Sequence, residues 1–370
     1  MAAASRRLAR ALYSAVAKPL LFAAYPDDAH KLTLRAAGLM DRLPWLARVF
    51  AQEEQPLRPT TVGGVTLPQP VIVAAGLVKG QGFETEDAAL SAVGRSNVIP
   101  GWRSIPLMCG PVEFGSFTLA PRVGNAGTVL WRDVNGLTTM NRVGLKNPGS
   151  AAAAEFLSRQ PIDGTFGISV ATTPEVDDPT VQAAHVAQAI GRFIEEGVRP
   201  DWFTVNLSCP NTEQDPTATQ TTALASAVCA ATVERAGTVP VWVKVSPDLG
   251  DTQYDSLLEV FEDNGVRAVV ATNTLPGIVP STDIRAGAGG KCLYERALSV
   301  VLRLYAVRER RSYSVDIVGC GGVMNGVDLR AYLDAGALAV QVWSALVFRG
   351  PFAPEDITRE YLEILKEGQS

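Results

Sequence analysis

Short apolar runs recur along the chain from about residue 60 onward, and most are separated by segments with helical periodicity, such as 179–198 and 255–265. Strands buried on both faces of a parallel sheet form such near-continuous apolar runs. Eight runs that alternate with helices over about 290 residues are typical of a (β/α)8 TIM barrel of the α/β class. An open, doubly wound sheet is the alternative, because a count of strands does not show that the sheet closes. The predicted strands are residues 71–76, 112–116, 166–170, 202–208, 241–246, 269–273, 316–322 and 339–345.

An amphipathic helix is predicted before these runs. Three interpretations of it remain open: a helix lying on a membrane surface, a helix packed on the main domain, and a targeting segment that is removed. No run of 18 or more apolar residues is present, so no membrane-spanning helix is predicted. The pattern consists of apolar residues at helical spacing and of basic residues beside them: Leu8, Leu12, Val16 and Leu20, with Arg6, Arg7, Arg10 and Lys18.

Pro26 and Asp27 end this first helix, and a second helix is predicted as far as about Pro44. We therefore expect a short N-terminal helical extension over residues 1–45 and a barrel domain over residues 46–370. No polar strand end lies within residues 1–42, so their removal is expected to leave the site of the barrel intact.

Composition and charge narrow the function. The 370 residues are 47% hydrophobic and 19% charged, with a formal net charge of −5, which is typical of a globular protein and gives no support for nucleic-acid binding. Five scattered cysteines without a C-x-x-C pair indicate neither a disulfide framework nor a zinc or iron–sulfur site. With two histidines, a Ser-His-Asp hydrolase and a multi-histidine metal centre are not expected.

Polar residues gather where the predicted strands end, and the loops at these ends build the sites of such barrels. A lysine at a strand end is most often only solvated, because burial of its ammonium is costly. Lys79 and Lys244 are accompanied by asparagines at matching ends, which instead indicates a binding site. Gly321 and Gly322, together with Ser344 after the last strand, match a phosphate-binding position common in these barrels.

The fourth predicted strand runs into the sequence VNLSCPNT at 205–212. A free cysteine usually behaves as a small buried apolar group. Cys209, however, lies between Ser208 and Pro210, close to two asparagines. It is therefore a candidate reactive residue, with a buried thiol as the alternative.

Seven motifs carry a family resemblance: AAGLVKGQG, NRVGLKNPG, VNLSCPNT, VKVSPDL, VVATNT, VGCGGV and VQVWSALVFRGP. In this order and spacing they resemble the dihydroorotate dehydrogenase family over most of residues 58–352. They are specific for the superfamily and less so for its substrate. The segment LLFAAYPDDAHKLTL is similar to the N-terminal extension of the membrane-associated, quinone-dependent branch, a helical pair that in the family lies on the membrane and forms the quinone entrance.

The resemblance implies FMN-dependent oxidation of dihydroorotate to orotate in de novo pyrimidine biosynthesis, with quinone as the expected electron acceptor. It also implies a protein held peripherally at the cytoplasmic face of a membrane, or at the mitochondrial inner membrane of a eukaryote; a soluble cytoplasmic protein is the alternative. Two other functions remain open: a related flavin oxidoreductase acting on another cyclic amide or biosynthetic intermediate, and a barrel without FMN that serves as a scaffold.

Oxidation of dihydroorotate removes a proton from one ring carbon and a hydride from its neighbour, so the site needs a base and an electron acceptor. The resemblance assigns Cys209 as the base and FMN as the acceptor, without a metal. It assigns substrate binding to Lys79, Asn141, Gly144, Leu145, Asn206, Asn211, Asn273 and Thr274. It assigns cofactor binding to Ala75, Gly76, Lys79, Ser116, Asn141, Ser169, Asn206, Lys244, Thr272, Gly321, Gly322, Trp343 and Ser344.

This chain departs from the family pattern in several places. Cysteine at position 209 belongs to the soluble branch, whereas the quinone-dependent branch has serine, so the base and the extension point to different branches. Ser169 stands where the family has asparagine, and Ala345 replaces a glycine. Glu295 is aligned close to the phosphate, which its charge would repel unless the side chain points away. Residues 95–111 are interpreted as an insertion that lengthens the region of the second strand.

Overall fold

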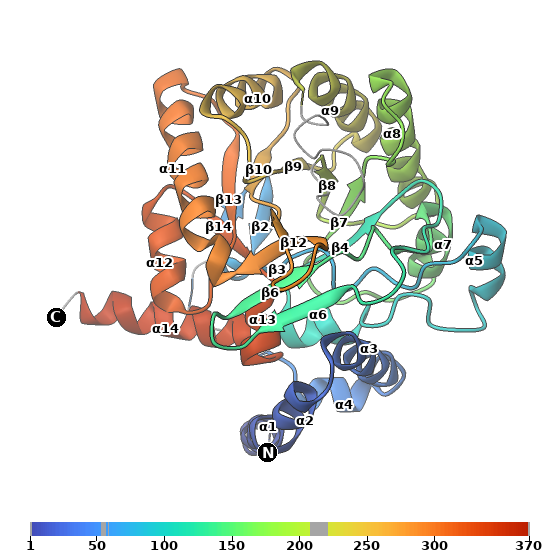
Figure 1. Ribbon diagram of the computed structural model, residues 1–370, viewed down its shortest axis with the longest axis vertical. Helices are drawn as coiled ribbons and strands as arrows, with labels where there is room; N and C mark the ends of the chain where they lie inside the picture. Colours follow the sequence, from blue (N-terminus) through green and yellow to red (C-terminus); the bar gives the residue numbers. More distant parts are fainter. Residues whose placement is uncertain (1, 53–56, 58, 208–220, 369–370) are drawn as a thin grey trace.

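The computed structural model describes residues 2–52, 57, 59–207 and 221–368. Its centre is a closed barrel of parallel strands in the spatial order β10-β13-β14-β3-β4-β7-β8-β9 (Figure 1). The closed sheet confirms the predicted TIM barrel over the open sheet, and each predicted run holds one barrel strand. The strands are β3 (Val71–Val73), β4 (Val112–Phe117), β7 (Phe166–Ala171), β8 (Trp202–Asn206), β9 (Val241–Val245), β10 (Ala268–Ala271), β13 (Asp316–Cys320) and β14 (Ala339–Val342).

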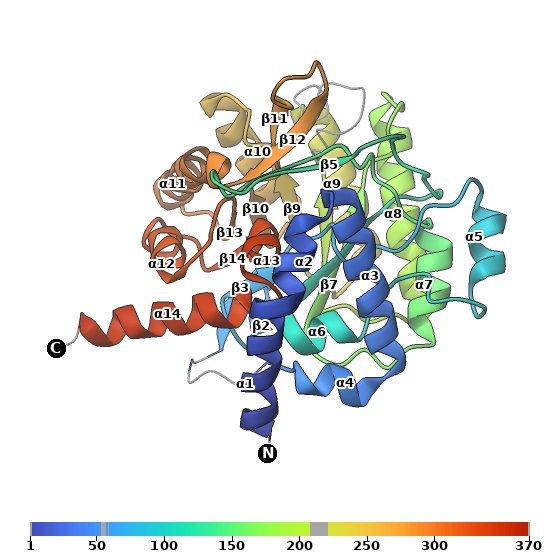
Figure 2. The ribbon, with the colours of Figure 1, turned by 60° about the horizontal axis from the view of Figure 1, so that its bottom comes forward.

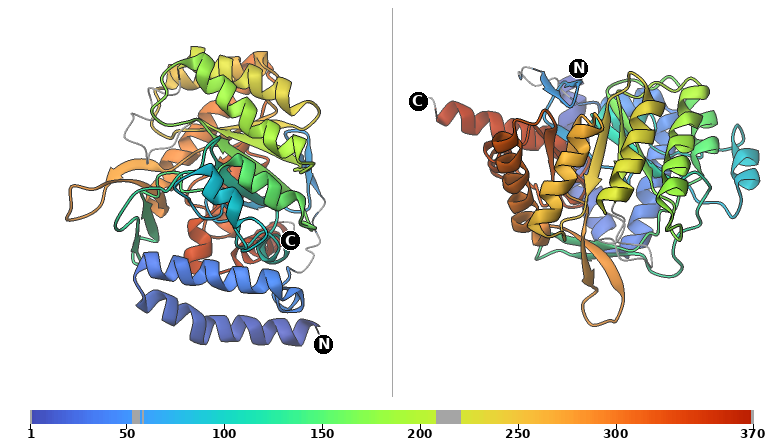
Figure 3. Two further views of the ribbon diagram at one scale, coloured as in Figure 1. Left: turned by 90° about the vertical axis from the view of Figure 1, so that its right-hand side faces the viewer. Right: turned by 90° about the horizontal axis from the view of Figure 1, so that it is seen from above.

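Helices surround the barrel and cover its outer face, and α8, α9 and α10 stand side by side (Figures 1 and 3). The start of α8 has clear local causes: Asp178 accepts hydrogen bonds from the backbone of Thr180 and Val181, and Pro179 occupies the first turn. The surrounding helices include α6 (Ser104–Cys109), α7 (Ser150–Ser158), α8 (Pro179–Glu195), α9 (Thr222–Ala236), α10 (Asp251–Asp263), α11 (Tyr294–Arg311), α12 (Gly326–Asp334), α13 (Ser344–Arg349) and α14 (Ala353–Glu367).

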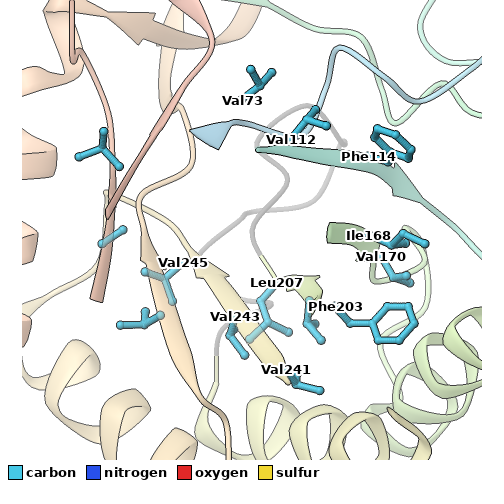
Figure 4. Packing of buried hydrophobic residues seen from close by; sticks show 14 of the residues in the cluster. Val73, Val112, Phe114, Ile168, Val170, Phe203, Leu207, Val241, Val243 and Val245 are labelled. Carbon is cyan, nitrogen blue, oxygen red and sulfur yellow. The ribbon is translucent and has the colours of Figure 1, made fainter. Parts of the chain in front are cut away.

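Side chains alternate along each barrel strand between the barrel interior and the layer between the strands and the surrounding helices. On β8, Phe203 and Val205 belong to the large apolar cluster shown in part in Figure 4, which also contains apolar residues of the surrounding helices. Trp202 belongs to a second cluster at the base of the barrel, and Thr204 and Asn206 share its strand face. Because side chains alternate with a period of two, the barrel interior can be polar while the outer layer of each strand stays apolar.

The base of the barrel is closed by aromatic packing. The hairpin of β1 (Thr60–Val62) and β2 (Val65–Leu67) packs there with Trp202 and Trp242, whose rings stack with centroids 4.6 Å apart. Gly167 on the neighbouring strand makes room for this pair, because a Cβ at that position would lie 2.0 Å from the indole of Trp202. The open end of the barrel is therefore the opposite one, where the carboxyl ends of the strands lie.

A four-stranded antiparallel sheet extends over that open end (Figure 2). It consists of β11 (Leu275–Ile278), β12 (Arg285–Gly290), β6 (Thr138–Asn141) and β5 (Leu130–Asp133), in this order. The sequence analysis did not predict this sheet. β5, β6 and β11 are short and largely half-exposed, and β12 is mostly buried but made of glycine and alanine after Arg285, so all four lack the apolar runs that identified the barrel strands.

The N-terminal segment forms helices along one side of the barrel (Figures 2 and 3). These extension helices are α1 (Ala2–Leu12), a π-helical turn (Tyr13–Ala17), α2 (Lys18–Ala23), α3 (Pro26–Arg42) and α4 (Pro44–Val49). The predicted break at Pro26 separates α2 from α3, whereas the predicted domain boundary at residue 45 lies inside α4. No helix in the described ranges is long and apolar enough to cross a membrane.

One side of the extension helices packs on the last helix of the barrel. Arg6 and Arg10 form ion pairs with the buried Glu355 on α14, and both guanidinium groups lie over the ring of Phe352. Arg10 also reaches Asp356 at 2.7 Å. Two of the four basic side chains of the predicted amphipathic helix therefore attach it to the barrel, which agrees with the interpretation that this helix packs on the main domain.

A buried carboxylate joins α3 to residues 97–104. Asp41 accepts hydrogen bonds from the backbone nitrogen of Gly101 (2.7 Å) and from the backbone nitrogen and hydroxyl of Ser104 (both 2.9 Å). The amide of Asn97 also donates to it at 2.7 Å. The extension is therefore bonded to the barrel domain. Removal of residues 1–42 would leave these buried donors without their acceptor, and that the site of the barrel then stays intact remains a prediction.

The segment interpreted as an insertion is part of the core. Val98, Ile99, Trp102 and Met108 of residues 95–111 are buried in the main cluster, and α6 occupies the position between β3 and β4. The helix that stands out from the barrel is α5 (Glu86–Ala92), just before that segment (Figure 1).

Candidate active site

A cavity at the carboxyl ends of the barrel strands brings together most of the residues that the sequence analysis selected. Its floor comes from the barrel strands, one wall comes from β6 and β12, and a further side chain comes from α3. The predicted residues that line it are Ala75, Gly76, Lys79, Ser116, Asn141, Gly144, Leu145, Asn206, Lys244, Thr272, Asn273, Thr274, Gly321, Gly322, Trp343 and Ser344.

A chain of amide and hydroxyl groups crosses the floor of the cavity. The amide of Asn273 donates to the side-chain oxygen of Asn206 at 3.2 Å, and the amide of Asn206 donates to the hydroxyl of Ser116 at 3.1 Å. These bonds orient each amide, so the remaining donors and acceptors have fixed directions. Such an edge suits a ring that presents alternating carbonyl and N–H groups.

Ser169 does not line the cavity. It is fully buried, and its hydroxyl lies 2.8 Å from the hydroxyl of Ser116. Its hydroxyl pairs with that of Ser116, which does line the cavity, so Ser169 supports a cavity residue here and its direct contact with a cofactor stays a prediction.

Two lysines give the cavity positive charge, and they come from different strands. Lys244 at the end of β9 is 7% exposed and donates to the side-chain oxygen of Gln341 at 2.9 Å. Its ammonium also lies 3.4 Å from the sulfur of Cys320. Lys79 follows β3 and lines the cavity nearer the extension helices, since its charge acts on His30.

Thr274 carries an orphaned polar atom. Its hydroxyl is buried and has no hydrogen-bond partner within the described residues, and the residue lines the cavity. A buried hydroxyl without a partner is costly, so this group indicates that a polar ligand completes the site. The backbone nitrogen of Thr274 is already used by Asn273 at 2.8 Å.

The glycine-rich side of the cavity agrees with the predicted phosphate position. Gly322 has a φ of +68°, and a Cβ there would come within 2.6 Å of Tyr294, so glycine is needed. The hydroxyl of Ser344 lies 2.7 Å from that of Thr139. Glu295 is exposed and does not line the cavity, so the expected repulsion of a phosphate does not arise there.

His30 is a wall residue that the sequence analysis missed. It belongs to α3, lines the cavity, and its ring centroid lies 6.5 Å from that of Trp343. Burial, together with the positive charge of Lys79, lowers the pKa of His30 to about 4 against the opposing effect of Asp27. The imidazole is therefore neutral near pH 7, and the extension supplies an uncharged polar group to the cavity.

Two predicted residues, Cys209 and Asn211, lie outside the described residues, so the assignment of Cys209 as the base stays a prediction. Other lining residues were missed because their polar or small side chains stood within apolar or unassigned segments; they include Thr139, Gly289, Gly290, Cys320 and Gln341. A glutamine within the run AVQV was the signal that could have identified Gln341. In the described part of the chain, no group of three or more His, Cys, Asp or Glu residues could hold a metal ion.

Comparison with known proteins agrees with this geometry. A sequence profile of the family described as dihydroorotate dehydrogenase matches residues 58–365. Three curated proteins named dihydroorotate dehydrogenase (quinone) are similar over nearly the whole chain. The protein from Akkermansia muciniphila is 31% identical over 96% of this chain and 97% of its own length. The protein from Anaeromyxobacter sp. is 35% identical over 90% of this chain and 87% of its own length. The protein from Stenotrophomonas maltophilia is 34% identical over 92% of this chain and 93% of its own length.

Among solved structures, ligand-free DHODH from Eimeria tenella has a TM-score of 0.72 at 21% identity and covers 90% of this chain and 95% of its own. At that identity the structural likeness supports the fold alone. The sequence matches confirm the family resemblance found in the seven motifs.

Proposed function

This chain belongs to the dihydroorotate dehydrogenase family, and from that premise we propose that its cavity holds FMN beside dihydroorotate. Its activity is the oxidation of dihydroorotate to orotate in pyrimidine biosynthesis, with a quinone as electron acceptor. The observation that carries the proposal is that the polar strand ends predicted from the sequence line one cavity, including the orphaned hydroxyl of Thr274.

The donor set supports FMN as the cofactor. Lys244 offers a nearly buried ammonium to an electron-rich ring, and Gly321, Gly322 and Ser344 gather on the side expected for the phosphate. The exposed position of Glu295 removes the main objection to a phosphate at that place. FMN, when bound, supplies the acceptor for the hydride that leaves the substrate.

The chain's own residues would bind the substrate and move its proton. Lys79 neutralises the carboxylate of dihydroorotate, and Asn206 and Asn273 offer oriented amide groups to its ring. Cys209 stays the predicted base, so its thiolate would take the proton from the ring carbon. The curated relatives of the quinone type match the extension as well as the barrel, which favours the quinone-dependent branch despite this cysteine.

An absorbance spectrum of the purified protein tests this proposal. We expect a bound flavin with bands in the visible range that bleach when dihydroorotate is added without oxygen, and that return when a quinone is supplied. A flavin that only another cyclic amide bleaches would contradict the substrate, and a colourless protein that takes up no added FMN would contradict the cofactor.

Lys79→Ala is expected to raise the KM for dihydroorotate about 10- to 100-fold and to leave the FMN content nearly unchanged. The reason is that a charge-assisted bond to a carboxylate contributes about 1.5–3 kcal/mol. Steady-state kinetics and the ratio of flavin to protein measure the two effects. Lys146→Ala, which removes a nearby lysine that does not line the cavity, is the control. Isolation of the Lys79→Ala protein without flavin would assign this lysine to the cofactor instead.

The extension helices also support peripheral membrane contact. Their outer side carries large apolar residues that are more than half exposed, and exposed basic residues such as Arg7, Lys31 and Arg35 flank them. Helices of this kind bind at the surface of anionic membranes through apolar burial and charge attraction. We infer attachment at the cytoplasmic face of a membrane. The exposed apolar residues are Leu8, Leu12, Val16, Leu20, Tyr25, Leu32, Leu39 and Trp45.

The double variant Leu12→Gln and Leu20→Gln is expected to bind vesicles of neutral and anionic phospholipid at least about tenfold more weakly, because burial of one leucine contributes about 1.5–3 kcal/mol. Co-flotation of the protein with vesicles measures this binding. Leu302→Gln is the matched control, since this leucine on α11 is 51% exposed and lies away from the extension helices. Equal flotation of the double variant and the control would contradict membrane attachment through this surface.

A further inference from the structure

A carboxylate lies fully buried inside the barrel, below the cavity. Glu113 on β4 has no exposed surface, and three donors converge on its Oε2: the hydroxyl of Thr204 at 2.5 Å, the indole nitrogen of Trp202 at 3.0 Å and the amide of Gln341 at 3.0 Å. Its Oε1 is buried without a hydrogen-bond partner in the described part of the chain. A buried carboxylate is costly unless a cation compensates it.

The ammonium of Lys244 is linked to Glu113 through the side-chain amide of Gln341. The side-chain oxygen of Gln341 accepts a hydrogen bond from the ammonium of Lys244 at 2.9 Å, while its nitrogen donates to Glu113. Both ends fix the orientation of this amide, because the reverse orientation would point its N–H groups at the ammonium and its oxygen at the carboxylate. Strand alternation places all three side chains on the inner face of the barrel.

We propose that Glu113 is a positioning residue that holds Lys244 through Gln341 and limits the positive potential of this ammonium in the cavity. The inference rests on the proposed binding of FMN. A positive charge beside a flavin stabilises its reduced, electron-rich ring. A buried negative charge behind that lysine weakens this stabilisation. Glu113 therefore sets how readily the bound flavin gives its electrons onward, although it contacts neither flavin nor substrate.

Sulfite binding to the purified, FMN-loaded chain tests this inference without turnover. Sulfite adds to the flavin ring and leaves negative charge on it, so its affinity reports the local potential. Glu113→Gln keeps the shape of the side chain and an oxygen that can accept the same donors, but it removes the charge. We expect the Kd for sulfite to fall about tenfold and the midpoint potential of the flavin to rise by the equivalent of about 30 mV for a two-electron couple.

Three further variants separate charge from structure. Thr204→Val removes one hydrogen bond to the same carboxylate oxygen without changing charge, and it should leave the Kd for sulfite within about twofold. In a Lys244→Met background, Glu113→Gln should have a clearly smaller effect, because the part that depends on the position of the lysine is lost. If Glu113→Gln does not fold, Gln341→Met breaks the same connection and should lower the Kd in the same direction.

An unchanged Kd for sulfite in Glu113→Gln or Gln341→Met, at normal flavin content, would overturn the inference. A shift in Thr204→Val as large as that in Glu113→Gln would also overturn it, since packing would then explain both. A wild-type protein that binds no flavin would contradict the proposed function, which is a separate outcome.

Discussion

Cys209→Ala is expected to keep its flavin and its affinity for orotate, yet to reduce the flavin with dihydroorotate about 10²- to 10⁴-fold more slowly. Loss of a general base costs a reaction about this factor, whereas neither flavin nor product binding needs a proton acceptor. Anaerobic stopped-flow mixing with dihydroorotate measures the rate. Cys209→Ser is expected to recover part of it, because serine serves as the base in the quinone-dependent branch.

The melting temperatures of both variants provide the control. If Cys209 were only a buried thiol, alanine would reduce stability by about 1 kcal/mol and leave flavin reduction almost unchanged. A Cys209→Ala protein that reduces its flavin at nearly the wild-type rate would exclude this cysteine as the base.

Asp41→Ala is expected to lower the free energy of unfolding by about 3 kcal/mol or more. The change removes the acceptor for buried donors on Gly101 and Ser104, and each orphaned donor costs about 1–3 kcal/mol. Urea unfolding followed by tryptophan fluorescence measures the loss. Because α3 also carries His30, the flavin content should fall together with the stability.

Asp28→Ala is the matched control on the same helix. Its carboxylate is exposed and lies 3.6 Å from the ammonium of Lys31, so its loss should cost less than about 1 kcal/mol. If Asp41→Ala and Asp28→Ala unfolded at the same urea concentration, the extension helices would be an independent unit, as their sequence alone suggested.

The barrel was predictable because its strands are buried on both faces and therefore form continuous apolar runs. The polar floor of the cavity was predictable for the same reason, since Asn206, Lys244 and Asn273 interrupt or end such runs. The sheet over the open end was not, because short, half-exposed strands carry no such pattern.

Contacts between segments that are distant in the sequence could not be predicted either. Asp41 is one acidic residue among several in a helical pattern, and only the fold brings it to Ser104. Likewise, nothing in the sequence around His30 indicates that this residue lies in the cavity wall. Residues 95–111 were interpreted as an insertion because their length was compared with the family pattern, and the packing of their apolar residues at 98, 99, 102 and 108 in the core became visible only in the fold.

The ion pairs of α1 also affect how the protein is made. Arg10 contacts Asp356, so α1 is synthesised well before the helix that carries its partner. At about 5–20 residues per second, ribosomes need roughly 20–70 s for the 346 residues between them. During that interval the first helix has a side rich in leucine and a side with arginines that have no acidic partner from α14. The nascent chain thus offers to chaperones, or to a lipid surface, a helix that the finished protein covers on one side.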